Sequence, residues 1–277
     1  MNQERSIECW GNIEMTEAQK EIIRREENEF PKLFTLYHET EYGILFYNEN
    51  NKDSYDSNHA VIYPERIKNL SDVLRNIVNF YKIKNITPLI YHPFVKGYFE
   101  KNEKTFLECG FKITTEESHC VSLLSEKSRV VPNGTIEIQK LTKWDERIAK
   151  DILIPNKQHY EALVCEESMK HVDNHVFVGY KNGKAVVYVI FHVSLLGCTR
   201  FDFIVTAKEE RGNGYARQIM HRVSDYCHKE KLPLCATWFA NPTSERLNYE
   251  VGFRPTDFYI EAGYASYVEK TNINVGL

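Results

Sequence analysis

The feature that most constrains this chain is a strand-like segment that runs through a glycine turn straight into an amphipathic helix. It covers residues 203–227, FIVTAKEERGNGYARQIMHRVSDYC. Gly212 and Gly214 stand in the turn, and apolar residues then recur at three- and four-residue spacing from Ala216 to Cys227. Such a corner presents unpaired backbone N–H groups at the positive end of a helix, and glycine lets a phosphate approach the backbone closely. The segment therefore predicts an anion site.

Three kinds of phosphate-binding corner share this layout. A dinucleotide-binding turn needs a third glycine where Arg217 stands, and a P-loop needs Gly-Lys-Ser/Thr, which is absent. The hexapeptide RGNGYA at 211–216 instead resembles the Arg/Gln-x-x-Gly-x-Gly/Ala signature of the GNAT acetyltransferase superfamily. The resemblance covers roughly residues 131–277 and includes Asn241 and the helix end at Gly252-Phe253.

The resemblance implies that acetyl-coenzyme A binds as cosubstrate, with its pyrophosphate on the glycine loop and no metal. A backbone N–H near Ile204 or Val205 is then expected to polarise the thioester carbonyl. The cofactor-binding residues implied by the family pattern are Ile204, Val205, Thr206, Arg211, Gly212, Asn213, Gly214, Tyr215, Ala216 and Asn241.

Two catalytic candidates follow from the same resemblance. Asp202, on the strand before the corner, is a candidate base, and the alternative is an outward-facing polar residue of an alternating strand. The family's usual acid, a tyrosine four residues before Gly-Phe, is replaced by Asn248. Tyr249 beside it is the candidate acid, with a packed aromatic as the alternative. His192 in an apolar strand is more typical of a satisfied core residue than of a base.

Residues 126–134, with Pro132 and an Asn133-Gly134 turn, separate two strand-like runs and predict a linker. We expect two domains, residues 1–130 and 131–277. After the linker, alternation and helical periodicity predict a mixed α/β order. The expected elements are a strand at 135–141, helices at 144–153 and 160–171, a hairpin at 175–193 turning at Asn182-Gly183, a strand at 199–205, a helix at 215–231, a strand at 232–240, a helix at 243–251 and a strand region at 258–268.

The first half repeats this order faintly, and the segments 104–118 and 245–259 both contain a helix closed by Gly-Phe. The place for a glycine loop, residues 62–76, contains no glycine. We therefore expect two GNAT-like domains, each a mixed β-sheet flanked by helices, of which the N-terminal one is a degenerate copy without a cofactor loop. The alternative is an unrelated α+β domain.

Composition limits the partners. The formal net charge is −4, from 35 basic and 39 acidic residues, so no basic footprint indicates nucleic acid or a membrane surface. Seven cysteines without a Cys-x-x-Cys pair argue against disulfides and zinc. The N-terminus lacks the apolar region of a secretory signal. We expect a cytoplasmic protein, either a monomeric pseudo-dimer or a homodimer.

Further polar clusters have less specific patterns. Asp53, Asp56, Asn58 and His59 lack the spacing of a calcium loop and indicate a solvated turn. Tyr160, Glu166, Glu167 and His171 fall on the helix that covers the acceptor side in the superfamily, or else on a solvated helix face. The prediction is an acetyl-CoA-dependent N-acetyltransferase acting on a small-molecule or protein amine. A non-catalytic coenzyme A-binding or protein-interaction module is the alternative.

Overall fold

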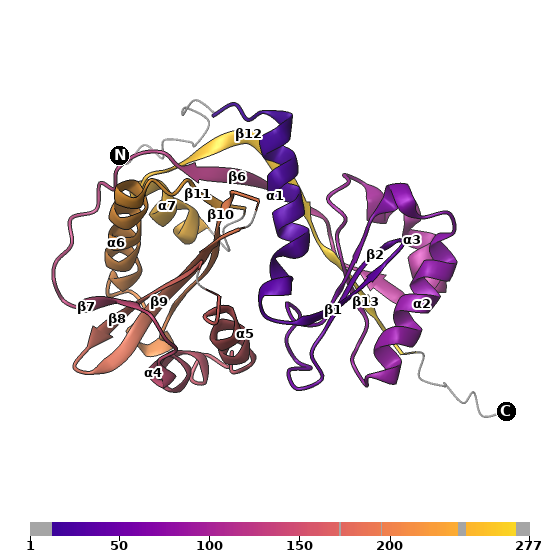
Figure 1. Cartoon of the computed structure of the whole chain (residues 1–277), viewed down its shortest axis with the longest axis horizontal. Helices are drawn as coiled ribbons and strands as arrows, with labels where there is room; N and C mark the ends of the chain where they lie inside the picture. The colour runs from indigo at the N-terminus through magenta and orange to yellow at the C-terminus, as the bar shows by residue number, and fades with distance from the viewer. Residues whose placement is uncertain (1–12, 172, 195, 238–241, 270–277) are drawn as a thin grey trace, which may run out of the picture. The chain divides into compact units, whose positions relative to one another are not determined.

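The chain folds into two compact units, each assembled from two separate stretches of sequence (Figure 1). The computed structural model describes residues 13–171, 173–194, 196–237 and 242–269. Unit 1 comprises Met1–Leu33 with His119–Ile260, and unit 2 comprises Phe34–Ser118 with Glu261–Leu277. The domain boundary proposed between residues 130 and 131 thus divides the chain differently from the compact units, because both sequence halves contribute to each unit.

Unit 1 contains a seven-stranded mixed sheet. In spatial order its strands are β12 (Phe253–Ala262), β6 (Glu117–Leu124), β11 (Leu234–Ala236), β10 (Thr199–Thr206), β9 (Lys184–Val193), β8 (Asn174–Lys181) and β7 (Glu137–Leu141). Strands β10 and β11 run parallel, so the chain must cross over between them, and helix α6 makes this connection.

Helices cover both faces of this sheet. They are α1 (Glu17–Glu29), α4 (Glu146–Ile148), the π-helical η4 (Ala149–Leu153), α5 (Tyr160–Ser168), α6 (Tyr215–Glu230) and α7 (Pro242–Glu250). Alternation along β9 supplies one core on each face: Val187, Val189 and Phe191 pack with α6, and Tyr188 and Ile190 pack with α4, η4 and α5.

The N-terminal helix α1 was not predicted from the sequence. It begins with a capping box in which the Thr16 hydroxyl accepts from the backbone of Gln19, and the Gln19 side chain accepts from the backbone of Thr16. Its inward face is unusual because it buries Glu26 and Glu27 beside Ile23. Lys20 pairs with Asp257 of β12, at 3.0 Å, and thereby ties the helix to the edge of the sheet.

Unit 2 contains a six-stranded mixed sheet packed against two amphipathic helices, α2 (Leu70–Ile83) and α3 (Tyr98–Glu108). Its strands in spatial order are β1 (Leu36–Thr40), β2 (Gly43–Tyr47), β3 (Ala60–Ile62), β4 (Leu89–Tyr91), β13 (Tyr264–Tyr267) and β5 (Phe111–Ile113). Large aromatic residues fill its core, among them Tyr81, Phe99, Phe106 and Phe111.

The two sheets share one connectivity. The spatial order β8-β9-β10-β11-β6-β12 in unit 1 corresponds to β1-β2-β3-β4-β13-β5 in unit 2. In both, the first three strands are antiparallel and the third pairs in parallel with the fourth. In both, the fifth place is filled from far along the chain: β13 joins the N-terminal sheet, and β6 joins the C-terminal one. The expected fold class, two mixed sheets flanked by helices, is confirmed.

The two Gly-Phe corners explain why the sequence segments 104–118 and 245–259 look alike. The carbonyl of Gly252 accepts backbone hydrogen bonds at the end of β6, and the carbonyl of Gly110 accepts one just after β13. A Cβ on Gly252 would lie 1.9 Å from the Glu126 carbonyl oxygen, and a Cβ on Gly110 would lie 2.9 Å from the Tyr267 ring. Each glycine therefore allows the inserted strand to pass close to the helix end.

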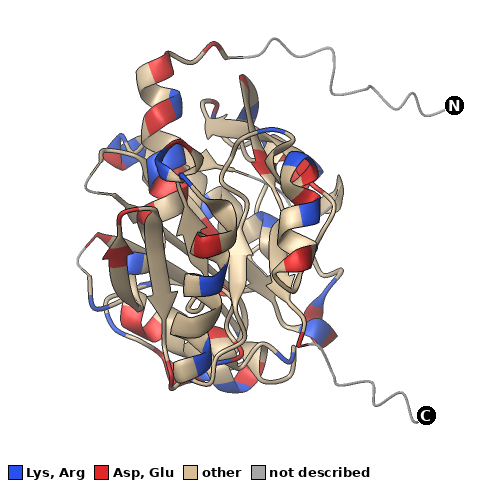
Figure 2. Cartoon of the chain, turned by 90° about the vertical axis from the view of Figure 1, so that its right-hand side faces the viewer, with Lys and Arg blue, Asp and Glu red and all other residues tan. Residues whose placement is uncertain are grey.

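In Figure 2 acidic and basic positions are interspersed along the helices. Among the described residues, no helix combines the length and the apolar character that crossing a bilayer requires.

Candidate active site

The glycine corner has the conformation that its sequence predicts. Strand β10 ends at Thr206, a short turn at Lys208–Glu210 follows, and α6 begins at Tyr215. Gly212 and Gly214 have φ of +84° and +76°, in the left-handed region that L side chains rarely adopt. A Cβ built on either glycine finds no atom within 4 Å. Close packing therefore does not explain the glycines at these two positions. The space next to their Cα atoms is open to a ligand.

The N-terminus of α6 suits an anion. Its N-cap is Gly214, no side chain caps the helix, and its first turn contains no acidic residue. The first N–H groups of a helix have no intrahelical partner and stand at the positive end of its dipole. Arg217 adds a cation close by, although it also pairs with Glu250 at 2.5 Å. Phosphate oxygens are among the anionic ligands that such a terminus binds.

Asn156 fixes the approach to this corner. It lies in the connection between η4 and α5, and its side chain donates to the Thr206 carbonyl at 3.0 Å and accepts from the Lys208 N–H at 2.8 Å. The Asn213 side chain donates to the Glu210 carbonyl at 3.0 Å, which closes the loop on itself. These bonds hold the strand end and the loop without using the N-terminus of α6.

Within the described residues, one edge of β10 has no paired strand beside the corner. Strands β10 and β11 pair only at Thr199↔Leu234 and Arg200↔Cys235, whereas β10 continues to pair with β9 as far as Thr206. Along the described part of the chain, residues 201–206 therefore have a strand neighbour on one side only. Ile204, Val205 and Thr206 are half-buried on this segment. An extended ligand could bind there as an added strand. Asn241, which was predicted to bind the cofactor, lies outside the described residues.

Asp202 occupies a β-bulge at the start of this open edge. The register with β9 shifts between Phe201 and Phe203, so Asp202 is the extra residue. Its side chain is only 7% exposed, and its two oxygens accept from His192 Nδ1 at 2.8 Å and from Arg200 Nη1 at 2.6 Å. The outward-facing alternative for Asp202 is therefore wrong. Its role as a base stays a prediction.

His192 is a satisfied buried residue, as the sequence indicated. Its Nε2 lies 2.6 Å from Glu26 Oε1, and its Nδ1 faces Asp202. Burial alone would lower the pKa of His192, but the charge of Asp202 and hydrogen bonds to both carboxylates outweigh it and raise the pKa to about 10. A protonated imidazolium cannot accept a proton, so His192 is not a base at neutral pH.

The segment that was expected to supply an acid lies on α7. The Asn248 side chain is buried, and its Nδ2 donates to the Ser244 carbonyl at 2.9 Å. The Tyr249 ring lies against the guanidinium of Arg254, whose Cζ is 4.1 Å from the ring centroid. Burial raises the pKa of Tyr249, which keeps the phenol protonated as an acid requires. Its role as acid stays a prediction, and the aromatic packing foreseen as the alternative is also present.

The acceptor-side candidates on α5 and just after it do not face the core. Glu166 and His171 are exposed, and Glu167 pairs with Lys170. The buried positions of this helix include Glu161 and Cys165, and Cys165 Sγ lies 3.7 Å from the buried Tyr188 hydroxyl. Helical spacing from Val164 would have placed Glu161 inward. Sequence reasoning missed it because a glutamate is expected in solvent.

The loop with Asp53, Asp56, Asn58 and His59 is held by hydrogen bonds within itself. Asn58 donates to backbone carbonyls of its own loop, and His59 Nδ1 lies 2.9 Å from the Tyr55 carbonyl oxygen. Among the described residues, no three His, Cys, Asp or Glu side chains lie close enough together to hold a metal ion. The loop is folded around its buried amide, where the sequence had indicated a solvated turn.

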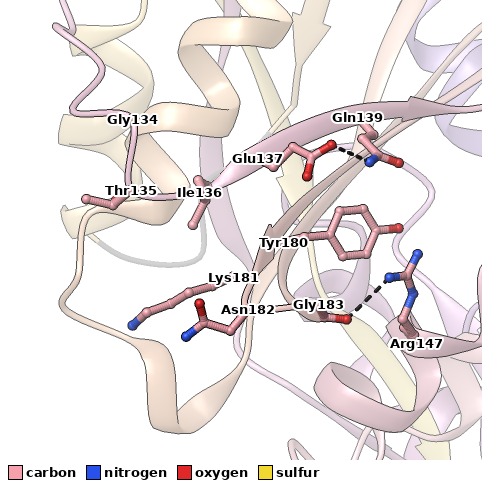
Figure 3. A pocket seen from close by; sticks show the side chains of 10 residues that line it. All are labelled: Gly134, Thr135, Ile136, Glu137, Gln139, Arg147, Tyr180, Lys181, Asn182 and Gly183. Atoms are coloured by element: carbon pink, nitrogen blue, oxygen red, sulfur yellow. Dashed lines mark hydrogen bonds between the residues drawn. The ribbon is translucent and has the colours of Figure 1, made fainter.

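A groove of about 470 Å³ lies at the same end of the sheet as the corner (Figure 3). It is lined from the start of β7, the hairpin turn at Asn182-Gly183 and α4. Its two cations are already engaged: Arg147 pairs with Asp145 at 2.7 Å, and Lys181 pairs with Glu210 at 3.3 Å. We therefore assign the groove no ligand.

In unit 2 the corresponding corner differs from the glycine corner in backbone conformation, helix capping and charge. None of the residues 63–69 between β3 and α2 has a positive φ. The α2 N-cap is Asn69, whose side chain accepts from the Asp72 N–H at 3.4 Å. Asp72 also places a carboxylate in the first turn. The helix terminus that would face a phosphate is thus capped and negatively charged.

A family model described as acetyltransferase (GNAT) domain matches residues 149–268. This part of the chain belongs to the GNAT acetyltransferase superfamily. The match includes the glycine corner, the open edge of β10 and helix α7, so the resemblance seen in the sequence is confirmed. No curated protein matches the sequence.

Solved structures resemble the fold of both units. A GCN5-related N-acetyltransferase from Kribbella flavida is 11% identical with a TM-score of 0.60, and the match covers 92% of this chain and 97% of that one. A conserved protein of unknown function from Staphylococcus epidermidis ATCC 12228 is 15% identical with a TM-score of 0.55, covering 84% and 94%. A GCN5-related N-acetyltransferase-like protein from Streptococcus suis 89/1591 is 13% identical with a TM-score of 0.50, covering 89% and 99%. At these identities the likeness shows the fold.

Proposed function

We propose that unit 1 is an acetyl-CoA-dependent N-acetyltransferase that transfers an acetyl group to an amine by direct attack on the thioester. The observation that carries this proposal is the pairing of an uncapped, glycine-lined helix terminus with an open strand edge. A GNAT domain that retains both features has a place for a pyrophosphate and a place for an extended pantetheine arm.

The residues of the corner fit the cofactor. Gly212 and Gly214 leave open space above the backbone, and the first N–H groups of α6 would hold the pyrophosphate. Backbone groups of Ile204, Val205 and Thr206 on the open edge would hold the pantetheine amides. The cofactor itself supplies an activated acetyl thioester.

Three tasks remain for the chain: binding the carbonyl oxygen, accepting the proton of the amine and protonating the thiolate. A backbone N–H at the bulge or at Ile204 is proposed for the first task. Asp202 can serve as base only through its remaining lone pairs or a water, because both oxygens already accept hydrogen bonds from cations. Tyr249 is the proposed acid.

Unit 2 is proposed to be a degenerate copy that binds no cofactor. The side-chain cap from Asn69 and the carboxylate of Asp72 occupy and oppose the site that a phosphate would need. The residues 63–69 contain no glycine in a left-handed conformation. One site per chain follows.

The experiment is steady-state release of free thiol from acetyl-CoA with a panel of amines, from polyamines and aminoglycosides to amino acids and peptide amines. Amine-dependent thiol release is expected for at least one class. A chain that binds coenzyme A but turns over none of the panel would favour the alternative, a non-catalytic coenzyme A-binding or interaction module.

A further inference from the structure

Five charged side chains are buried together in unit 1, on the face of the sheet opposite α6. Two come from the N-terminal helix α1, one from β9 and two from β10. They are Glu26, Glu27, His192, Arg200 and Asp202, and each side chain is at most 7% exposed.

The contacts form one chain of hydrogen bonds. Glu26 accepts from His192 Nε2 at 2.6 Å, and His192 Nδ1 donates to one oxygen of Asp202 at 2.8 Å. Arg200 donates to the other Asp202 oxygen at 2.6 Å and binds Glu27 with two bonds, of 2.8 and 3.0 Å. The Arg200 guanidinium also lies 3.7 Å from the Phe30 ring centroid. Both oxygens of Asp202 are thus held by cations that α1 in turn holds.

Asp202 connects this network to the open edge of β10. Asp202 is the extra residue of the bulge in β10, and the bulge lies where β11 stops pairing and the open edge begins. A bulged residue has a backbone conformation that ladder hydrogen bonds do not fix. Its side chain contacts therefore decide how the neighbouring N–H groups point.

We propose that Glu26 and Glu27 of α1 are positioning residues: acting through His192 and Arg200, they hold the Asp202 bulge in the geometry that acetyl transfer requires. This inference rests on the proposed function of unit 1. It makes the N-terminal helix a working part of the acetyltransferase unit, although the 85 residues Phe34–Ser118 of unit 2 separate this helix in sequence from the rest of unit 1.

The charge balance requires both cations. Three carboxylates face Arg200 and His192. Removing the partner of a buried carboxylate strongly destabilises the folded protein, because an uncompensated charge is left in the interior. The raised pKa of His192 keeps its charge at neutral pH. Asp202, Glu26 and Arg200 are the charged groups that face the imidazole, so no other described charge contacts it.

The test uses the full chain with Glu26→Gln, Glu27→Gln and Arg200→Lys. Gln keeps an acceptor for the donated bond, and Lys keeps the charge of Arg200 but loses its two-pronged geometry. The matched control is Lys20→Gln, which breaks the Lys20–Asp257 pair on the same helix, away from the network. Coenzyme A titration counts binding-competent sites in each variant, and kcat is divided by that count.

We expect kcat per binding site to fall roughly tenfold or more in the network variants, because small displacements of reacting groups reduce rates by such factors. The KM for acetyl-CoA should stay near the wild-type value in the network variants. The control Lys20→Gln should keep both the wild-type kcat per site and the wild-type KM. Network variants with wild-type kcat per site, or a control that falls equally, would overturn the proposal. Any variant that does not fold is replaced in the comparison by Glu26→Gln, the mildest change. If the wild-type chain itself transfers no acetyl group, the proposed function fails and the positioning role fails with it. If the wild type is active and only the comparison of variants fails, the positioning role alone is wrong.

Discussion

Replacing Gly214 by alanine should separate folding from cofactor binding. At φ of +76° an L residue pays a left-handed strain of about 1–2 kcal/mol. No atom lies within 4 Å of the added Cβ, so no clash adds to this figure. The free energy of unfolding should therefore fall by about 1–2 kcal/mol, and the chain should still fold.

Binding should suffer more than folding. The new methyl group occupies the open space above the N-terminus of α6, where we place the pyrophosphate. A hydrogen bond to a charged group contributes about 1.5–3 kcal/mol. The loss of one such bond predicts roughly a 10- to 100-fold weaker Kd for coenzyme A. Gly214→Val, which is larger and β-branched, should remove measurable binding.

Gly183→Ala is the matched control. Gly183 has φ of +79°, also finds no atom within 4 Å of a built Cβ, and lies in the β8–β9 turn. It should lose the same stability in urea unfolding and keep wild-type affinity by isothermal titration. Unchanged affinity in Gly214→Ala and Gly214→Val, or an equal loss in Gly183→Ala, would refute the assignment of the corner.

Three further predictions concern the acid, the exchanged strand and the buried histidine. Tyr249→Phe should lower kcat at least about tenfold with near-normal coenzyme A affinity, and wild-type turnover would leave Tyr249 as packing. The fragment 131–277 lacks β6 and should aggregate because β11 and β12 lose their neighbour. The fragment 117–262 keeps β6, so equal solubility of the two in size-exclusion chromatography contradicts the role of the exchange. The pKa of His192 is raised to about 10, so its stabilisation is complete below its unfolded value and is lost as pH rises toward 10. Urea unfolding of the wild type should weaken between pH 7 and 10 more than that of His192→Gln, and parallel curves would exclude this linkage.

Local patterns were enough to predict much of unit 1. The Asn182-Gly183 turn lies between β8 and β9 as expected, and the apolar spacing after Gly214 corresponds to α6. Both features depend on neighbours in sequence, where turn chemistry and helical period act directly. The corner was recognised for the same reason.

The exchanged strands could not be assigned from pattern. The segment 258–268 was expected to be one strand region, but it includes parts of β12 and β13, which belong to different sheets. The segment 112–124 likewise includes parts of β5 and β6, which also belong to different sheets. Alternation shows that a segment is a strand but does not name its partner. The Gly-Phe repeat was the one local trace of the exchange.

The network around Asp202 is also nonlocal. Glu26 lies 166 positions from His192, and Glu27 lies 173 positions from Arg200. A glutamate pair on a charged helix is typical of a solvent-exposed face, so no local pattern predicted that this pair is buried. The Thr16–Gln19 capping box was a local signal for the start of α1. Because α1 was not predicted, the helix that supplies the carboxylates around Asp202 was not predicted either.

The central claim is that each chain holds one coenzyme A site, at residues 211–216 of unit 1. Isothermal titration of coenzyme A into the full-length chain tests it most directly, because the stoichiometry counts sites whatever the acceptor. The account predicts one coenzyme A per chain, and Gly214→Val should abolish that signal. Two per chain would contradict the degenerate state of unit 2, and no binding would contradict the assignment of the glycine corner itself.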